Sequence, residues 1–325
     1  MNNPLNFEYE VFKHYYHKGI FARAGIITHL IAHLRENLQK ENRMTQHQEI
    51  GLNDNEVVAV CQLAIIAHIM MFIEDLAVIC QSIKDGKIEY YNFLDKSGDE
   101  DLGNFIRKFY EETKNATDQD LAKILSFSNL DSFEFVKDNE KEIVSKIIKQ
   151  MLEKTRIFFD KVILFRENHI KIFRRYKHAG FPILLAQPMP TPSDLYKNFE
   201  SVSLGLTSRG KLGEELTAIP YSSKTIDSYE NLEKDIFAFF GTLITYKFIC
   251  YERNVDGLTP NSKSLFGLKL SISEIAILDE IWKRFESKHP LEGRNKTQIG
   301  LDSMTEFLHW YVDLEKNAKR VLNSE

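Results

Sequence analysis

The sequence predicts an all-α protein, a helical bundle with long helices and one Pro-rich, partly β insertion at about 180–222. Three observations support this fold class. Long stretches repeat apolar residues at spacings of three and four, which is the period of a helix. Five of the eight prolines lie inside the insertion. The chain of 325 residues is 43% hydrophobic and 27% charged, which is typical of a globular protein with a sizeable core.

The N-terminal part contains two long helical segments. The first, 5–43, has helix-forming residues throughout and one break near Gly19. The second, 53–84, begins with capping residues and ends near Gly86. Its most apolar stretch, Val57–Ile73, is short of the roughly 20 clean apolar residues that span a bilayer. We therefore expect the central helix of a soluble core and no membrane contact.

Cysteine usage and the N-terminus indicate a cytoplasmic protein. Cys61, Cys80 and Cys250 are odd in number and far apart, and no CxxC or CxxH pair is present. Buried free thiols in a reducing compartment are the natural interpretation. The segment Met1–Glu10 is polar and acidic, unlike a secretory signal peptide. The net charge of -5 argues against a chain that coats nucleic acid with its whole surface.

The middle of the chain predicts two shorter helices, near 99–114 and 118–127, and then one long helix over 140–178. Along the long helix one stripe of residues is spaced alternately four and three apart. Its members are Val144, Ile148, Met151, Thr155, Phe158, Val162, Phe165, His169, Ile172 and Tyr176. Gly180 and Pro182 end this helix, since Gly can adopt the left-handed cap and Pro cannot continue the helix.

The C-terminal part resumes helices after the insertion. We expect them at 224–253, from a capping box at Ser271–Glu274 to about His289, and from about 297 to 322. Within the insertion, residues 199–206 alternate well enough for a strand. The predicted organisation has three parts: a helical core at 1–180, an irregular or β-hairpin insertion at 181–222, and C-terminal helices at 223–325 that pack on the same core.

The long helix carries the one charge anomaly in the chain. Residues 141–178 contain eleven Lys and Arg against four Asp and Glu, and the last turns hold five of these cations. The helix dipole stabilises cations at a C-terminus, which accounts for part of the cluster. The alternative is a site for RNA or a nucleotide, since Arg donates to phosphate, Tyr stacks on bases and His transfers protons near neutral pH. The predicted site comprises His178 and Arg174 as catalytic residues and Arg175, Tyr176 and Lys177 as ligand-binding residues.

The same segment carries a local family resemblance. Arg175–Pro182 reads Arg-Tyr-Lys-His-Ala-Gly-Phe-Pro and resembles the end of a long helix in HEPN-like all-α proteins. That resemblance implies a helical bundle that forms a homodimer and either cleaves RNA without a metal or cofactor, or only binds nucleotides or partners. The family's catalytic Arg and His have four to six residues between them, whereas three separate Arg174 from His178. Arg23 and His29 have the family spacing, but a polar residue does not follow Arg23.

Two other hypotheses stay open. The first is a di-metal site, since Glu-x-x-His pairs on two helices, with carboxylates from two others, form such sites in helical bundles. The pairs are Glu286 with His289 and Glu306 with His309, and Glu74 or Asp75 could add a carboxylate. The second is a non-catalytic helical interaction module. Histidines His14, His17, His29, His33 and His68 are ordinary surface or core residues in our interpretation. The chain lacks the Gly-rich phosphate loops and the GxSxG elbow, which argues against nucleotide-triphosphate hydrolysis, dinucleotide redox chemistry and α/β-hydrolase chemistry.

Overall fold

The structure is a computed structural model, and the statements below concern the residues that it describes. These are residues 20–39, 54–84, 99–124, 135–177, 185–187, 201–206, 216–252 and 270–288. Several predicted features lie outside them: the start of the first helical segment, the helix at 297–322, and the residues His14, His17, His178, His289, Glu306 and His309.

The chain forms two compact units, and neither is a continuous stretch of sequence. The first contains α2 (Ile20–Gln39), α3 (Asp54–Lys84), α5 (Asp99–Lys114), the second half of α7 (Lys141–Lys177) and the first half of α8 (Ser223–Glu252). The second contains α6 (Asp118–Ile124), a 3-10 turn (Asp138–Glu140), α9 (Ile272–Lys288) and the remaining halves of α7 and α8. Helices therefore dominate the described part of the chain, as the all-α prediction requires.

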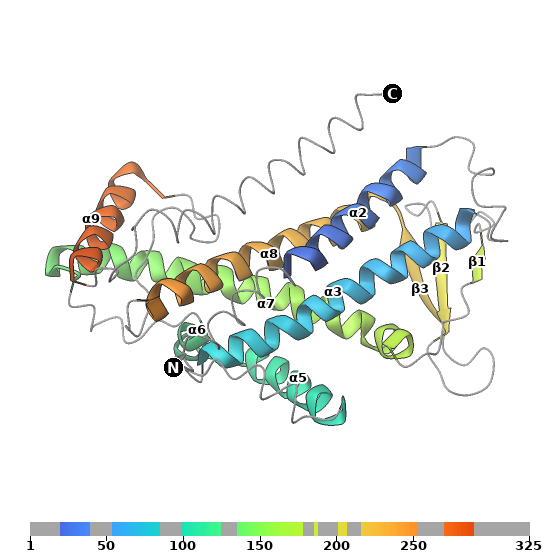
Figure 1. The fold of residues 1–325 in the computed structure, drawn as a ribbon, viewed down its shortest axis with the longest axis horizontal. Helices are drawn as coiled ribbons and strands as arrows, with labels where there is room; N and C mark the ends of the chain where they lie inside the picture. The colour runs from blue at the N-terminus through green and yellow to red at the C-terminus, as the bar shows by residue number, and fades with distance from the viewer. Residues whose placement is uncertain are drawn as a thin grey trace, which may run out of the picture. The chain divides into compact units, whose positions relative to one another are not determined.

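The central helix of the first unit is α3, which runs between α2 and α5 (Figure 1). Polar contacts join it to each of the other four helices in that unit: Asp75 to Arg23 of α2, Ile73 to Tyr110 of α5, Glu74 to Lys177 of α7, and Gln62 to Tyr229 of α8. Its apolar residues are completely buried at Ile65, Ile66, Ile69, Met70, Phe72, Ile73, Leu76 and Ala77. The prediction of a central core helix is confirmed for this unit.

One segment of α3, Val60–Gln81, is long and apolar enough to cross a membrane. Within the described residues it is the only segment that passes this test of length and composition. However, 72% of its most apolar window is buried against other parts of the chain. A core helix of a globular protein has the same properties, so the segment is weak evidence for a membrane span.

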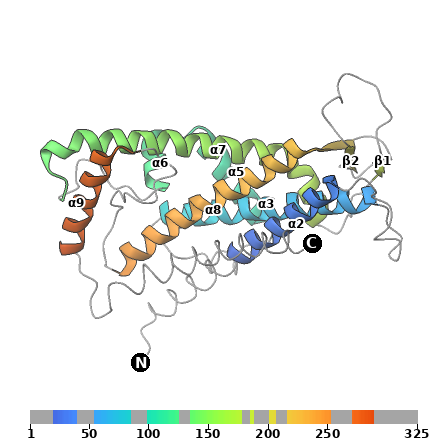
Figure 2. The same ribbon diagram turned by 90° about the horizontal axis from the view of Figure 1, so that it is seen from above.

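The apolar stripe of α7 is buried as the spacing predicts. Seven of its ten residues are buried, and two, Phe165 and His169, are half-buried. The last residue of the stripe, Tyr176, is 38% exposed. The stripe therefore leaves the core only in the final turn of the helix. Figure 2 shows α7 and α8 along their lengths.

Short polar side chains fix where several helices begin. At the predicted capping box, the backbone N–H of Ser271 donates to Glu274 over 2.8 Å, and the N–H of Glu274 donates to the Ser271 hydroxyl over 3.3 Å. This box is confirmed, and α9 begins at the next residue. Thr117 and Asp120 make the same reciprocal pair before α6. Such caps satisfy backbone donors that a helix start leaves open.

Three short strands lie between α7 and α8. They are β1 (Leu185–Gln187), β2 (Ser201–Leu206) and β3 (Leu216–Tyr221), paired antiparallel in the order β1-β2-β3. Pro220 lies opposite Val202 on β3, an edge strand, where a missing N–H is tolerated. The rest of 178–222 is outside the described residues apart from Ser222, so the predicted partly β insertion stays a prediction. The predicted packing of 223–325 on the core of 1–180 also stays a prediction.

Cys61 and Cys80 are free thiols on α3, half-buried and buried respectively. Burial raises the pKa of both thiols, so both are protonated at neutral pH. The side chain of Cys250 lies outside the described residues.

Candidate functional site

The candidate site begins with two adjacent carboxylates on the most apolar helix of the chain. Glu74 and Asp75 lie between buried apolar residues: Phe72 and Ile73 precede them, and Leu76 follows them. The side chains of Glu74 and Asp75 are 20% and 17% exposed. A carboxylate with so little exposure to water needs a positive charge nearby or a bound proton. These two residues therefore place two ionisable groups beside the apolar core of the first unit.

Three cations from two other helices surround the pair. The Lys177 Nζ lies 3.5 Å from the Glu74 Oε2, and the Arg23 Nε lies 3.2 Å from the Asp75 Oδ2. Arg166 is the third, and its guanidinium lies 5.5 Å from the centre of the Tyr110 ring. We call Arg23, Glu74, Asp75, Arg166 and Lys177 the Glu74 cluster. Its three cations outnumber its two carboxylates, so the cluster is net positive when all five are ionised.

Burial has the largest effect on the pKa values of Glu74 and Arg166. Burial raises the pKa of Glu74, and the nearby charges of Lys177, Arg166 and Arg23 lower it without cancelling the effect. Burial likewise lowers the pKa of Arg166, as does the neighbouring charge of Arg174. Burial therefore disfavours the charged forms of Glu74 and Arg166, and opposite charges nearby favour them.

Tyr110 forms one wall of the cluster and is itself fixed in place. Its hydroxyl donates to the Ile73 carbonyl oxygen over 2.6 Å, and burial raises the pKa of this hydroxyl well above its usual value. Its ring also packs edge-on against Phe109 at 5.1 Å between centroids. Tyr110 therefore stays neutral and holds its aromatic face under Arg166.

His68 lies seven residues before Asp75, on nearly the same face of α3. Its Nδ1 is buried, and no group of the described residues hydrogen-bonds to it. Burial and then the charge of Arg23 lower its pKa below 6.5, so the ring is neutral at pH 7. A buried water is the common partner for such an atom.

Of the five predicted site residues, the described part of the chain places three side chains. Lys177 belongs to the Glu74 cluster, and its Nζ also lies 5.9 Å from the Phe173 ring centre. Tyr176 is 38% exposed, and Arg174 is exposed. The side chain of Arg175 and all of His178 lie outside the described residues. The assignment of these five residues to one site therefore stays a prediction.

Arg174 differs from cations earlier on α7. Lys146 pairs with Glu274 at 3.0 Å, Arg156 with Asp118 at 2.9 Å, and Lys161 with Asp235 at 2.7 Å. No acidic side chain of the described residues pairs with Arg174, whose charge instead acts on Arg166. Within the described part of the chain, the last turns of α7 therefore include a cation, Arg174, that is not paired with an acidic side chain.

His169, the other titratable group on the stripe of α7, has a structural role. Its ring stacks on Phe165 at 4.2 Å, and its Nδ1 lies 2.8 Å from the Phe165 carbonyl oxygen. Burial lowers its pKa and the backbone hydrogen bond raises it, and burial is the larger effect. His169 is therefore a neutral core side chain.

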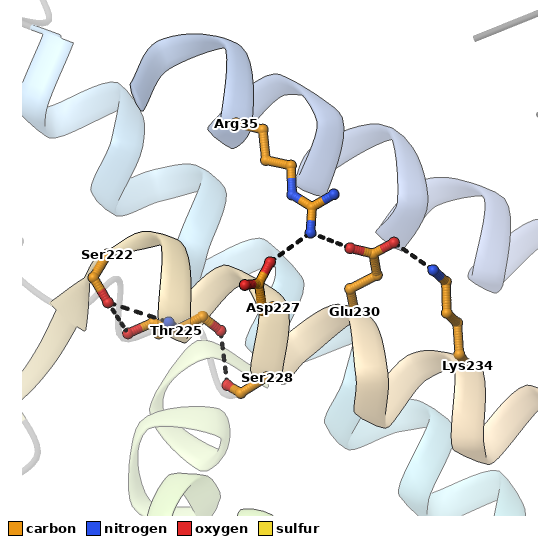
Figure 3. Close-up of polar contacts among 7 residues, drawn as sticks. All are labelled: Arg35, Ser222, Thr225, Asp227, Ser228, Glu230 and Lys234. Atoms are coloured by element: carbon orange, nitrogen blue, oxygen red, sulfur yellow. Dashed lines mark hydrogen bonds and ion pairs between the residues drawn. The ribbon is translucent and has the colours of Figure 1, made fainter. Parts of the chain in front are cut away.

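A second charged group lies on α8 and involves α2. Arg35 of α2 donates to Asp227 over 2.7 Å and also to Glu230, which Lys234 pairs from the other side (Figure 3). Close by in sequence, Glu233 is 6% exposed, and burial raises its pKa to about 7. The added charge of Glu230 raises this pKa further, whereas Lys234 lowers it.

The di-metal hypothesis gains no support. Within the described residues, no group of three or more His, Cys, Asp and Glu side chains could hold a metal ion. Glu286 lies on α9, but its side chain is not among those described, and the other three members of the two pairs lie outside. The hypothesis therefore stays untested at its own residues.

Comparison of the chain with protein-family models, with curated proteins and with solved structures gave no match. The HEPN-like resemblance therefore rests on the eight residues of sequence alone.

Sequence reasoning found some of these residues and missed others. It noted Glu74, Asp75 and Lys177. It did not pair Lys177 with Glu74, because the two residues lie about 100 positions apart in the sequence. It missed Glu233, although the sequence held a signal. Tyr229, Ile236 and Phe237 lie four before, three after and four after it, and these spacings place Glu233 on an apolar helix face.

Proposed function

We propose that this protein binds RNA, or another phosphate-bearing ligand, through the basic end of α7. The basic end of α7 is the set of five cations in its last turns, Arg166, Lys171, Arg174, Arg175 and Lys177. Between residues 166 and 177 these cations face a single acidic residue of the same helix, Glu167, which pairs with Lys114.

The observation that carries the proposal is the state of Arg174. It is exposed, no described acidic residue pairs with it, and it repels the half-buried Arg166. A phosphate group would relieve this repulsion, and guanidinium groups donate to phosphate oxygens in a bidentate way. Tyr176 is 38% exposed two residues later, so it could offer part of its ring to a base.

The proposal concerns binding, and cleavage is a separate hypothesis. RNA cleavage would require His178 as the acid–base group beside Arg174, as the sequence analysis predicts. A homodimer and a cytoplasmic location likewise stay predictions.

The test is binding of a fluorescently labelled, unstructured single-stranded RNA, followed by anisotropy at 50 and 200 mM salt. We expect Arg174→Gln to weaken binding several-fold at low salt. We also expect it to reduce the slope of log K against log salt by about 0.7, the contribution of one phosphate contact in a single strand.

The matched control is Lys149→Gln, which removes one exposed cation about seven turns earlier on the same helix. It should change the affinity by less than about twofold, because it lies far along α7 from the basic end. Absence of binding by the wild type at 50 mM salt would contradict the proposal. Equal losses in the two variants would show that only net charge matters, and would contradict it as well.

A further inference from the structure

We propose that Glu74 occupies part of the ligand's anion site in the free protein, and that a bound phosphate group replaces it as the partner of Lys177. This inference rests on the proposed function, since it assigns Lys177 to the phosphate site and names the group that competes for it. The ligand class is the same: a phosphate group of RNA or of another phosphate-bearing molecule.

The contact between Glu74 and Lys177 is suited to exchange. Its 3.5 Å separation is longer than the roughly 2.7–2.9 Å of a strong charge-assisted hydrogen bond. The Lys177 side chain is 36% exposed, so its ammonium reaches solvent as well as the carboxylate. A lysine ammonium is a point charge on a flexible stem, so it can turn toward a new anion without moving the helix.

Lys177 shares one face of α7 with a second cation of the same site. Arg166 lies eleven residues earlier, which places the two side chains within about 20° of each other around the helix. Arg174 lies three residues before Lys177 and is a neighbour on the helix surface. A phosphate at Lys177 would therefore also interact with the charge of Arg174, with which no described acidic side chain pairs.

Glu74 would not be left without compensation after Lys177 turns away. Arg23 from α2 and Arg166 from α7 act on it besides Lys177, and Tyr110 of α5 and the adjacent Asp75 are further titratable neighbours among the described residues. Two cations therefore remain near the carboxylate. Because burial also raises its pKa, Glu74 can instead take up a proton more readily than an exposed glutamate.

The experiment is a double-mutant cycle with the same labelled RNA at 50 mM salt. Glu74→Gln keeps the shape of the side chain and removes its charge, so we expect affinity to rise about threefold to tenfold. Lys177→Gln should weaken binding. In the Lys177→Gln background, the gain from Glu74→Gln should disappear, since the competition needs both groups.

The charge-matched control is Glu167→Gln, which removes a carboxylate from the same part of α7 but one that pairs with Lys114. It should raise affinity by less than about twofold through the general field alone. The gain from Glu74→Gln should also shrink as the pH is lowered, because burial raises the pKa of the wild-type carboxylate, which therefore takes up a proton more readily than an exposed glutamate. If Glu74→Gln fails to fold, Glu74→Asp withdraws the carboxylate from Lys177 and should give a gain in the same direction.

The outcomes separate the two proposals. If the wild type binds but Glu74→Gln gives the same gain with and without Lys177, the competition is absent and only this inference is overturned. If neither the wild type nor Glu74→Gln binds RNA, the proposed function fails and the inference fails with it. Because the inference rests on binding by the wild type, binding by Glu74→Gln alone would contradict both proposals.

Discussion

Glu74 and Glu233 lie on long apolar helices of the first unit, half-buried and buried respectively, and their surroundings differ. Glu74 on α3 acts with three cations from α2 and α7. Glu233 on α8 is 6% exposed, and its charged neighbours are Lys234, the next residue, and Glu230, a like charge. Burial raises the pKa of both groups, but among the described residues cations from neighbouring helices act on Glu74 and not on Glu233.

This difference separates a candidate site from a source of instability. A buried charge with partners on several helices is held in place by the fold, and such groups are common at functional sites. A buried carboxylate without such partners avoids the free-energy cost of a buried charge by binding a proton. Glu233 therefore makes stability depend on pH near neutrality, whereas the Glu74 cluster links three helices through ion pairs.

The largest expected effect is that of Glu233→Gln on stability. The pKa of Glu233 rises from an ordinary 4.5 to about 7 in the folded protein, so the folded state binds the proton more tightly. Its contribution to stability is fully present below about pH 4.5 and is lost as the pH rises through about 7. Glu233→Gln should therefore stabilise the protein at pH 8, by about 3 kcal/mol at most.

Urea unfolding of the wild type and Glu233→Gln, followed by circular dichroism from pH 5 to 8, measures this gain. The difference between the two proteins should grow with pH and level off above about pH 7. Glu36→Gln on α2 removes an exposed carboxylate and should change stability by less than about 0.5 kcal/mol at every pH. A difference that is constant across the pH range would show that Glu233 does not titrate there.

An intermediate effect is expected from Arg23→Met, which removes a cation from the Glu74 cluster. Asp75 would lose the cation at 3.2 Å while remaining only 17% exposed. We expect a loss of about 1–3 kcal/mol at pH 7, since a positive charge is removed beside a carboxylate that is mostly shielded from water.

The double variant Arg23→Met with Asp75→Asn checks that reason, because it also removes the negative charge of Asp75. It should recover part of the lost stability in the same urea titration. If the double variant is less stable than Arg23→Met alone, packing of the Arg23 stem and not charge determines the loss.

The smallest expected effect is that of Glu230→Gln, which tests the environment of Glu233. The charge of Glu230 raises the pKa of Glu233, so its removal should move the pH dependence of stability toward lower pH. The stability change itself should stay below about 1 kcal/mol, since its partners Arg35 and Lys234 are largely exposed. An unchanged midpoint in the pH series of urea titrations would contradict this assignment.

The helices could be predicted from sequence because their signals are local. The spacing of apolar residues predicted α7 over 140–178, and the structure gives Lys141–Lys177. The helix predicted at 99–114 has the same bounds in α5. The capping box at Ser271 and Glu274 placed the start of α9. In each of these cases the deciding contacts lie within a few residues of one another.

The candidate site could not be assembled in the same way, because its contacts are distant in sequence. Charge counting pointed to the end of α7, and the carboxylates within an apolar helix were visible at Glu74 and Asp75. Nothing in the sequence connected Lys177 to Glu74, or Arg166 to Tyr110, since pairing across helices depends on how the helices pack. The charge pattern therefore identified Arg166 and Lys177 but not their partners.

The discontinuous first unit has a consequence for synthesis of the chain. Its last stretch ends at Phe237 on α8, and its earlier stretches include α2, α3 and α5. The contact between Gln62 of α3 and Tyr229 of α8 cannot form, and the first unit cannot be completed, until the ribosome has released that part of α8. Until then a nascent chain exposes a long apolar helix, a state prone to aggregation and suited to chaperone binding.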